Sequence, residues 1–530
     1  MSDLAHQFGG RKAVNAFINA YEAAWARLQS EPTGSPQTTQ DQQFEAALRD
    51  WLRYHSAMLI GELVPLTLEY ARANPTLEVF PTIRHVLADE YQDLNKADQE
   101  LVKTLASAGS LFVSGDDNQS IYRFRHANPA GIREFVAEHP GATGFVIDEC
   151  RRCPSNIVQM SNSLIANDPA RSRDAPLVST VGLSDAEVYV VQHDSLDEEA
   201  TSIAEYVDHY LRQHPDLPAG QVLILATRRV VGNRIRDALI ARGRNAVSFF
   251  AEDQLANRMA AEAFCMLRLL VSPLDRVTVR TWLAFGAADG RSRSYSRLRA
   301  VAEAEAREPS EVLTEVASGR RALPYTAALV ARWRVLEQRL LDVRSLTGLD
   351  LVRALWPTGA ADCEDVLRLA ENIAVDVPDP ADILERMIEE ITQPDLPPAD
   401  GDEIRVMSLH KSKGLTAALG VVADCMSGAL PTITANSATE RDAQYQEQRR
   451  LFYVAITRAT SALVISSAST LALRDAMASG VTIQGRSFHG GTVVARTSMS
   501  PFVRELGPTA PAAITTVEWR QRAGFETESR

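Results

Sequence analysis

The stretch His85-Val-Leu-Ala-Asp-Glu-Tyr-Gln-Asp93 decides the fold that the rest of this chain is expected to have. Residues 86–88 are a short apolar run, which is typical of a buried parallel strand. Asp89 and Glu90 follow where that strand should end, and in open α/β sheets ligands bind at the carboxyl ends of the strands. Asp89 could hold a Mg²⁺ there while Glu90 polarises a water for attack on a phosphate. The alternative for an isolated Asp-Glu pair is a solvated turn, so the surrounding sequence has to decide.

Length and composition indicate a globular protein of several domains. At 530 residues the chain should divide into roughly three or four domains. Its 45% hydrophobic and 23% charged residues are typical of soluble proteins. No apolar run approaches the roughly 18 residues of a membrane span, and the opening Met-Ser-Asp-Leu-Ala-His is not a signal peptide. We therefore expect a cytoplasmic location and no membrane partner.

The cysteines argue against a disulfide framework and against a zinc site. There are five of them, an odd number in a long chain. Cys150 and Cys153 have C-x-x-C spacing, but no second pair or nearby histidine completes a set of zinc ligands.

The net charge of −13 is concentrated in one part of the chain. Residues 361–403 hold fourteen Asp or Glu against two Arg, so the remaining residues are almost neutral as a group. We interpret this acidic block as a solvated face or linker. Local basic clusters such as Arg123, Arg125 and His126 can still form a groove for DNA.

Alternating strands and helices predict two α/β blocks. Strand, helix, strand at this spacing is typical of a parallel sheet. A mostly helical, acidic stretch at about 290–400 interrupts the second block. The expected strands are residues 86–88, 111–113 and 145–147 in the first block, and 188–192, 222–226, 404–409, 419–423 and 462–466 in the second. The expected helices cover about 11–29, 44–72, 96–108, 257–272, 276–284 and 443–459, and residues beyond about 508 are expected to form a frayed tail.

Polar residues follow several of these strands, where a nucleotide could sit. Hydrolysis of a phosphoanhydride needs a metal carboxylate, a group that orients water, and arginines that neutralise the developing charge. Each candidate alone is as easily a surface residue or a member of a structural ion pair. The candidates are Asp89, Glu90, Gln119, Arg152 and Arg458.

Together these segments resemble the UvrD/Rep-type superfamily 1 DNA helicases. The resemblance extends from about residue 44 to about residue 506, and the segments that match motifs II, III and VI are long and specific. The matching segments are Asp89-Glu-Tyr-Gln-Asp93 (motif II), Gly115-Asp-Asp-Asn-Gln-Ser-Ile-Tyr-Arg-Phe-Arg125 (motif III), Arg151-Arg-Cys-Pro154 (motif IV), His410–Leu415 (motif V) and Arg449–Ala459 (motif VI).

The resemblance implies an α/β fold of two RecA-like domains, with ATP and Mg²⁺ in the cleft between them. Asp89 would bind the Mg²⁺, Glu90 would be the catalytic base, and Gln119 would sense the γ-phosphate. Arg152 and Arg458 would act as arginine fingers from opposite sides of the cleft. The implied ATP-binding residues are Asp89, Glu90, Gln119, Arg152, Gly414 and Arg458.

The resemblance also implies a track for single-stranded DNA, because motif III aromatics stack on bases in this family. Tyr122 and Phe124 are the matching positions, with Arg125 and His126 beside them. His410 matches a residue that links the ATP site to the DNA. Stacking on aromatic rings tolerates any base sequence, which suits a translocating motor. Without the resemblance, Phe124 would be interpreted as a core aromatic.

The domains that the resemblance implies alternate between sheet and helix. They are a helical remnant of a 1B-like domain (1–80), the rear part of the first RecA-like domain (81–180), the second RecA-like domain (181–289 and 401–508), an acidic helical 2B-like insertion (290–400) and a tail (509–530).

One motif of the family is absent from the sequence. A P-loop needs Gly-Lys followed by Ser or Thr, because backbone amides cradle the phosphates and the lysine reaches the β and γ positions. None of the five lysines, Lys12, Lys96, Lys103, Lys411 and Lys413, follows a glycine. We expect the first strand and the P-loop to lie upstream of Met1. The first sheet would then be incomplete and would expose an edge.

The leading hypothesis is an ATP-dependent 3′-to-5′ DNA helicase of repair or replication, acting on single-stranded DNA or DNA with a 3′ tail. The chain would be truncated, or completed by a polypeptide that supplies the P-loop. Arg151 and Thr416 stand where many relatives have tyrosine and glutamate, which puts the adenine and ribose contacts in question. The alternative is a DNA-binding or regulatory protein without ATPase activity. A nuclease finds no support, because the C-terminal residues hold no acidic cluster with lysine.

Overall fold

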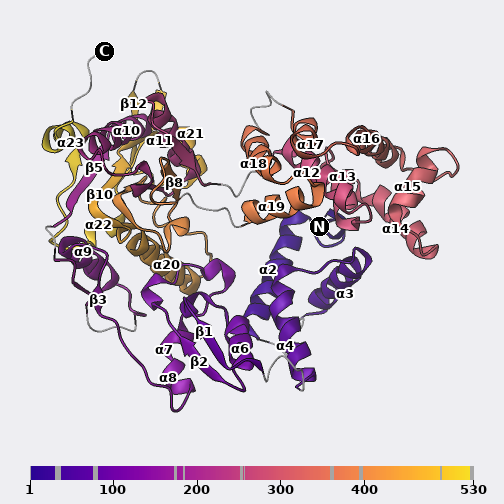
Figure 1. The fold of residues 1–530 in the computed structure, drawn as a ribbon, viewed down its shortest axis with the longest axis horizontal. Helices are drawn as coiled ribbons and strands as arrows, with labels where there is room; N and C mark the ends of the chain where they lie inside the picture. The colour runs from indigo at the N-terminus through magenta and orange to yellow at the C-terminus, as the bar shows by residue number, and fades with distance from the viewer. Residues whose placement is uncertain are drawn as a thin grey trace. The chain divides into compact units, whose positions relative to one another are not determined.

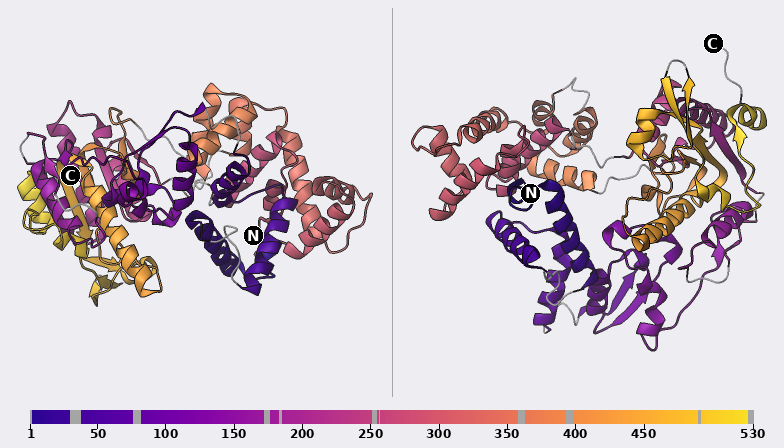
Figure 2. Two further views of the ribbon diagram at one scale, coloured as in Figure 1. Left: turned by 90° about the horizontal axis from the view of Figure 1, so that it is seen from below. Right: turned by 180° about the vertical axis from the view of Figure 1, so that it is seen from behind.

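The computed structural model describes residues 2–29, 38–75, 82–171, 176–182, 185–250, 255, 257–357, 363–392, 398–489 and 492–525. The chain divides into two compact units, which we call the helical unit and the sheet unit (Figures 1 and 2). The helical unit is residues 1–76 with 251–395, and the sheet unit is residues 77–250 with 396–530. No helix among the described residues is long and apolar enough to cross a membrane.

The helical unit joins the N-terminal helices to helices from the middle of the chain. Its helices are α1 (Ser2–Ala5), α2 (Arg11–Arg27), α3 (Thr39–Tyr54), α4 (Leu63–Ala73), α12 (Arg258–Val271), α13 (Arg276–Ala284), α14 (Ser292–Ala304), α15 (Pro309–Ala317), α16 (Ala327–Val343), α17 (Gly348–Leu355), α18 (Glu364–Asp376) and α19 (Pro380–Thr392). Arg280 forms an ion pair with Asp3 at 2.5 Å, and His55 Nε2 lies 3.1 Å from the hydroxyl of Tyr295. These contacts tie the two parts of the unit together.

The structure groups the middle helices differently from the domain division that the resemblance implied. α12 and α13 lie in the helical unit, although residues 257–289 were expected in the second RecA-like domain. α12 packs against α13, α17 and α19, and Trp282 of α13 is fully buried. The apolar faces of both helices are thus covered by other helices of the same unit. The proposed separation of residues 1–80 and 290–400 into two domains remains a prediction.

The sheet unit is built on a seven-stranded sheet in which every pairing is parallel, so the predicted α/β class is confirmed. The strands run in the order β14-β5-β10-β9-β6-β8-β7. They are β5 (Glu187–His193), β6 (Val222–Ala226), β7 (Ala246–Ser248), β8 (Ile404–Ser408), β9 (Ala417–Ala423), β10 (Ala459–Ala468) and β14 (Ile514–Thr515). All five predicted strands of the second block are present.

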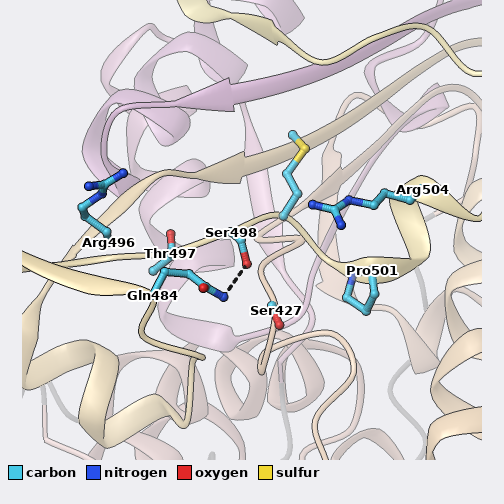
Figure 3. A pocket seen from close by; sticks show the side chains of 8 residues that line it. Ser427, Gln484, Arg496, Thr497, Ser498, Pro501 and Arg504 are labelled. Carbon is cyan, nitrogen blue, oxygen red and sulfur yellow. Dashed lines mark hydrogen bonds between the residues drawn. The ribbon is translucent and has the colours of Figure 1, made fainter.

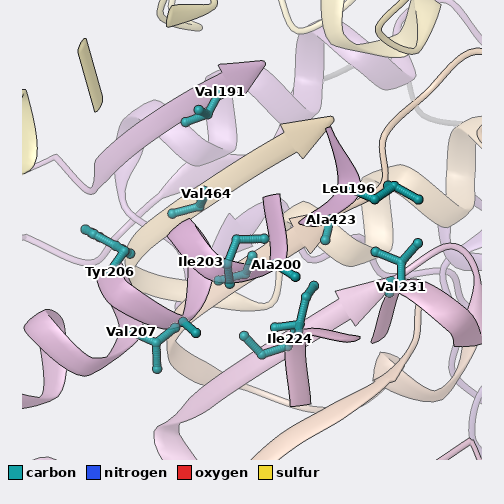
Figure 4. Packing of buried hydrophobic residues seen from close by; sticks show 14 of the residues in the cluster. Val191, Leu196, Ala200, Ile203, Tyr206, Val207, Ile224, Val231, Ala423 and Val464 are labelled. Atoms are coloured by element: carbon teal, nitrogen blue, oxygen red, sulfur yellow. The ribbon is translucent and has the colours of Figure 1, made fainter. Parts of the chain in front are cut away.

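Helices cover both faces of this sheet, which explains why its central strands read as continuous apolar runs. Ile224 of β6 lies in one buried cluster with residues of α10 (Leu196–Gln213) and α11 (Arg229–Ala241), as Figure 4 shows. Its neighbour Leu225 points to the other face, in a cluster with α9 (Ser155–Ile165) and α20 (Ala438–Ile456). The remaining elements of this part are α21 (Leu473–Ser479), α22 (Pro501–Arg504), and the antiparallel strands β11 (Thr470–Ala472), β12 (Gly485–His489) and β13 (Thr492–Arg496).

The first block forms only a two-stranded parallel sheet, β1 (His85–Ala88) with β2 (Ser110–Val113). The strand at residues 86–88 is therefore confirmed, but the expectation that it is buried is wrong. Leu87 and Phe112 are paired in register and are 75% and 60% exposed. An element packed on this face would bury both side chains. Their exposure therefore shows that no described element covers this face of the sheet. The other helices of the block are α6 (Lys96–Leu105), α7 (Ala130–Arg133) and α8 (Phe135–Glu138).

The predicted third strand of the first block is also not formed. Residues 145–147 belong to no strand, and Phe145 is 87% exposed. The chain pairs slightly later, where β3 (Glu149–Cys150) runs parallel to β4 (Val178–Ser179). An apolar run becomes a strand only where a neighbouring strand can accept its hydrogen bonds, and the described residues provide none beside residues 145–147.

The end of the chain is not a frayed tail up to residue 525, contrary to the prediction. β14 pairs with β5, and α23 (Thr516–Ala523) packs onto the sheet through the fully buried Trp519. Thr515 and Glu518 form a capping box at the start of α23. The composition around residue 510 suggested a frayed tail. The capping pair Thr515 and Glu518, followed by Trp519, was the sequence signal for a helix that was missed.

One buried carboxylate in the seven-stranded sheet makes stability depend on pH. Glu199 of α10 accepts hydrogen bonds from the amide of Asp424 and the hydroxyl of Ser466. Burial, helped by the nearby charge of Asp424, raises the pKa of Glu199 from 4.5 to about 7. Between these pH values the folded chain holds a proton that the unfolded chain has released. The free energy of unfolding should therefore fall by about 3 kcal/mol as pH rises from 4.5 to 7.

Glu199→Gln should flatten this pH dependence, because the amide keeps the acceptor oxygen and has no charge to bury. Urea unfolding at pH 5 and pH 8 measures the effect. The matched control is Asp197→Asn on the same helix, whose carboxylate is 85% exposed in its pair with Arg234. If the free energy of unfolding of Glu199→Gln varies with pH as steeply as that of the wild type, Glu199 is not the group responsible.

Candidate functional site

The carboxyl end of β1 presents two carboxylates in different surroundings. Asp89 Oδ1 accepts from Ser114 Oγ at 2.5 Å and from the amide of Glu90 at 2.9 Å. The Ser114 hydrogen bond is the main cause that lowers the pKa of Asp89, so this carboxylate stays ionised. Glu90 has a φ of 52°, a left-handed conformation that non-glycine residues rarely adopt. That turn places the two carboxylates side by side at the strand end.

Lys413, in the loop after β8 (Ile404–Ser408), connects this strand end to the rest of the sheet unit. Its Nζ lies 3.1 Å from Glu90 Oε2 and 2.5 Å from Asp93 Oδ2. The same ammonium donates to the carbonyl of Gln119 at 3.0 Å. Only 7% of the Lys413 side chain is exposed, so these contacts are shielded from solvent. Lys413 lies in the segment that matches motif V, but it was not among the predicted site residues.

Gln119 is held close to Glu90 by a second, buried amide. Gln92 is fully buried; its Nε2 donates to Glu90 Oε2 at 2.5 Å and its Oε1 accepts from the amide of Asp116 at 3.1 Å. Asp116 in turn accepts from Gln119 Nε2 at 3.0 Å. A Cβ at Gly115 would lie 2.2 Å from Gln92 Oε1, so a larger residue there would displace the Gln92 amide. The structure thus links Glu90 and Gln119 through Gln92 and Asp116.

The two candidate arginines lie within electrostatic range of each other. Arg458 is 1% exposed, and its guanidinium donates to the carbonyls of Val454 and Leu415 at 2.8 and 3.2 Å. Burial, followed by the charge of Arg152, lowers the pKa of Arg458 to about 10, while the more distant Glu90 acts to raise it. Arg458 therefore lies within electrostatic range of both Arg152 and Glu90.

Helix α20 holds the motif III loop in place. Glu447 Oε1 accepts from the amide of Arg123 at 2.7 Å. Arg450 donates to the carbonyl of Ser120 at 2.9 Å and forms an ion pair with Asp168 at 2.6 Å. These residues were not among the predicted site residues, although they lie in the motif VI helix.

The predicted DNA-binding side chains form one cluster beside these carboxylates. The ring of Phe124 is 64% exposed and meets the rings of Tyr122 and His410 edge-on, at 5.8 and 6.0 Å between centroids. The Arg125 guanidinium lies 5.5 Å from the centroid of the Tyr122 ring. Lys413 Nζ also lies 5.5 Å from that centroid. The interpretation of Phe124 as a core residue does not hold, because most of its ring faces solvent.

The other two predicted residues occupy left-handed turns of the same loops. His126 has a φ of 61° and ends the turn that carries Phe124. Gly414 has a φ of 81°, with no atom near the position of a Cβ. It follows Lys413 directly, so a glycine here lets the loop turn without strain.

The residues at the strand end fit a Mg²⁺ that shares its ligands with phosphate. No group of three or more His, Cys, Asp or Glu among the described residues could hold a metal ion by itself. Mg²⁺ commonly takes only one or two carboxylates and completes its shell with water and phosphate oxygens. Asp89 is ionised and exposed at the strand end, which suits that role.

A separate polar cavity of about 490 Å³ lies elsewhere in the sheet unit (Figure 3). None of the residues described above lines it. Its lining consists of Ser427, Gln484, Arg496, Thr497, Ser498, Met499, Pro501 and Arg504.

Comparisons with known families agree with the motif pattern. Residues 5–140 match the UvrD/REP helicase N-terminal domain, and residues 364–470 match the UvrD-like helicase C-terminal domain. These two regions include the ends of β1 and β2, the Lys413 loop and helix α20.

Several helicases are similar to this chain along most of its length. The ATP-dependent DNA helicase UvrD1 of Mycobacterium tuberculosis is 27% identical over 467 residues, covering 79% of this chain and 59% of the relative. Rep of Escherichia coli is 26% identical over 422 residues, covering 72% and 60%. PcrA of Staphylococcus epidermidis is 24% identical over 444 residues, covering 79% and 60%. The chain therefore spans about 60% of the length of these relatives.

Proposed function

Since the chain belongs to the UvrD/Rep-type superfamily 1 helicases, we propose that its sheet unit is an ATP-driven motor on single-stranded DNA. The motor moves 3′ to 5′ and unwinds duplexes that carry a 3′ tail, in repair or replication. ATP and Mg²⁺ bind at the carboxyl end of β1, and DNA binds along the aromatic cluster.

The observation that carries this proposal is the position of Lys413. One ammonium contacts the carboxylate of Glu90, the carbonyl of Gln119 and the face of the Tyr122 ring. A change of charge at Glu90 therefore acts on the same side chain that supports the aromatic cluster. Such a shared contact is a direct physical route between hydrolysis and movement of DNA.

The residues of this chain divide the chemistry as follows. Glu90 accepts the proton of the attacking water, and Gln92 and Lys413 hold its carboxylate in position. Asp89 binds the metal, and Mg²⁺ supplies charge neutralisation at the phosphates when bound. Arg152 and Arg458 neutralise negative charge that develops on the transferred phosphoryl group. The buried Arg458 needs no reorganisation to do so, because backbone carbonyls already fix its guanidinium.

We propose that the phosphate-binding loop is supplied by a polypeptide segment outside this sequence. None of the five lysines follows a glycine, so no Gly-Lys-[Ser/Thr] loop can form from these 530 residues. The exposed pair Leu87 and Phe112 supports a docking place for such a segment. Parallel sheets are normally covered on both faces, so a strand and helix fit against β1 and β2. The loop between them would meet Asp89 and Glu90 at the carboxyl edge.

The second candidate function is DNA binding without ATP hydrolysis. The absence of any Gly-Lys pair favours it. Both functions require the aromatic cluster, so only hydrolysis separates them.

The first test concerns DNA. Phe124→Ala should weaken binding of a poly-dT oligonucleotide about tenfold, because a base stacked on an aromatic ring contributes about 1–3 kcal/mol. Affinity should also fall as salt rises, since phosphate contacts release counterions. Fluorescence anisotropy at two salt concentrations measures both effects. The matched control is Phe488→Ala, which removes a ring that is 74% exposed in β12. Equal affinities for the two variants would exclude Phe124 from the DNA track.

A further inference from the structure

Two cysteines bracket the candidate arginine Arg152. Cys150 ends β3 and Cys153 lies just before α9, so the two thiols are separated by Arg151 and Arg152 in one tight turn. The amide of Cys153 donates to Cys150 Sγ at 3.5 Å. This hydrogen bond shows that the Cys150 side chain is directed toward Cys153 across the turn.

The two thiols differ in access and acidity. Cys150 is partly exposed, and the thiol of Cys153 is the main cause that lowers the pKa of Cys150. Cys153 is 1% exposed, and the Cys150 sulfur and burial raise its pKa. Cys153 Sγ donates its hydrogen bond to the carbonyl of Thr457 at 3.2 Å. An accessible thiolate beside a buried thiol is the arrangement of an attacking and a resolving cysteine.

We propose that Cys150 and Cys153 form a reversible disulfide that changes the position of Arg152. The oxidant is a low-molecular-weight disulfide such as oxidised glutathione. The Cys150 thiolate attacks one sulfur of the oxidant, the S–S bond of the oxidant breaks, and one thiolate leaves. Cys153 then loses its proton to solvent and attacks Cys150 Sγ, which expels the second thiol. The protein loses two protons and two electrons, and the oxidant gains them and becomes two thiols.

The disulfide would act on Arg152 in two ways. A covalent ring closed through residues 150–153 restricts the backbone that carries Arg152. Oxidation also removes the Cys153 proton, and with it the hydrogen bond to Thr457, the residue that precedes Arg458. Arg152 and Arg458 are electrostatic neighbours, so both cations are affected by one bond. Only the consequence for hydrolysis rests on the proposed function; the disulfide does not.

The test uses the full chain in mixtures of reduced and oxidised glutathione. After alkylation under denaturing conditions, the oxidised chain should carry two fewer alkyl groups than the reduced chain, and a Glu-C digest should place the bond between residues 150 and 153. Before oxidation, Cys150 should react with iodoacetamide at pH 6 at least tenfold faster than glutathione does. Trypsin should cleave after Arg151 and Arg152 at least fivefold more slowly in the oxidised chain, which reports on the turn without ATP.

Variants separate the roles of the two thiols. Cys153→Ser should accumulate one glutathione on Cys150, and Cys150→Ser should form neither the bond nor the adduct. Cys265→Ser, which removes a buried thiol of the helical unit, is the control and should oxidise as the wild type does. Absence of the disulfide in oxidised glutathione would overturn the proposal, as would equal trypsin cleavage of the two forms. If the disulfide forms and ATP hydrolysis by the chain with a P-loop segment supplied is unchanged, the proposed role of Arg152 in ATP hydrolysis falls instead.

Discussion

Glu90→Gln should slow ATP hydrolysis about a thousandfold in this chain once a segment with a P-loop is supplied. The Glu90 carboxylate can take a proton from water and is held by Gln92 and Lys413, whereas the proposal gives the neighbouring Asp89 to the metal. Glutamine is close to isosteric, so the hydrogen bond with Gln92 can persist while the proton acceptor is lost. The supplied segment would be an apolar strand, Gly-x-x-x-x-Gly-Lys-Thr and an amphipathic helix. Steady-state phosphate release with single-stranded DNA measures the effect.

The control for this substitution is Glu100→Gln in α6. Glu100 forms a surface ion pair with Lys103 at 3.6 Å and has no place in the proposed chemistry. Its variant should keep a rate within twofold of the wild type. A Glu90→Gln chain with a rate within threefold of the wild type would show that another group accepts the proton.

Lys413→Met should lower the free energy of unfolding by about 4 kcal/mol, because it leaves carboxylates without their counter-ion. Asp93 suffers most: burial raises the pKa of this carboxylate even with Lys413 hydrogen-bonded to it. Only 17% of its side chain is exposed, whereas Glu90 is 48% exposed and can be solvated. Urea unfolding followed by tryptophan fluorescence and circular dichroism measures the loss.

Two further variants show whether the loss arises from the ion pair. Adding Asp93→Asn to Lys413→Met should recover more than half of the lost free energy, since the buried charge is gone. Lys103→Met removes a lysine whose side chain is 54% exposed and should cost less than about 1 kcal/mol. If Lys413→Met behaves as Lys103→Met does, Lys413 does not connect the strand end to the motif III loop.

Sequence patterns predicted a buried strand correctly where the apolar run is covered by helices in the folded chain. β6 and β9 read as apolar runs because helices cover both faces of the seven-stranded sheet, and every residue of these two strands is buried. The same type of run at residues 86–88 forms a strand, yet Leu87 is exposed. Burial depends on a covering layer, and no local pattern reports whether that layer is present.

The failures at residues 145–147 and at the C-terminal end have the same origin in tertiary contacts. Phe145 begins a good strand sequence, yet residues 145–147 belong to no strand and Phe145 is 87% exposed. Trp519 follows a proline- and alanine-rich stretch that suggested disorder, but its burial against β5 and α10 outweighs that composition. In both cases the decisive partner is far away along the chain.

Site residues that belong to known motifs could be predicted from the sequence. Residues that reach the site only through long-range contacts could not. Glu90, Gln119 and the aromatic cluster follow from motifs II, III and V, and the structure places them together. Lys413 was not predicted as a site residue, because its importance depends on a contact with Asp93, 320 positions earlier in the chain. The effect of Arg152 and Glu90 on Arg458 is equally a product of folding.

The central claim is that the end of β1 is half of an ATP-hydrolysing site and needs a P-loop from outside this sequence. The most direct measurement is phosphate release from ATP and Mg²⁺ by the purified chain with single-stranded DNA, with and without the strand–P-loop–helix segment. We predict no DNA-stimulated hydrolysis by the chain alone, and hydrolysis that depends on Glu90 when the segment is present. Robust DNA-stimulated hydrolysis by the chain alone, abolished by Glu90→Gln, would contradict the account.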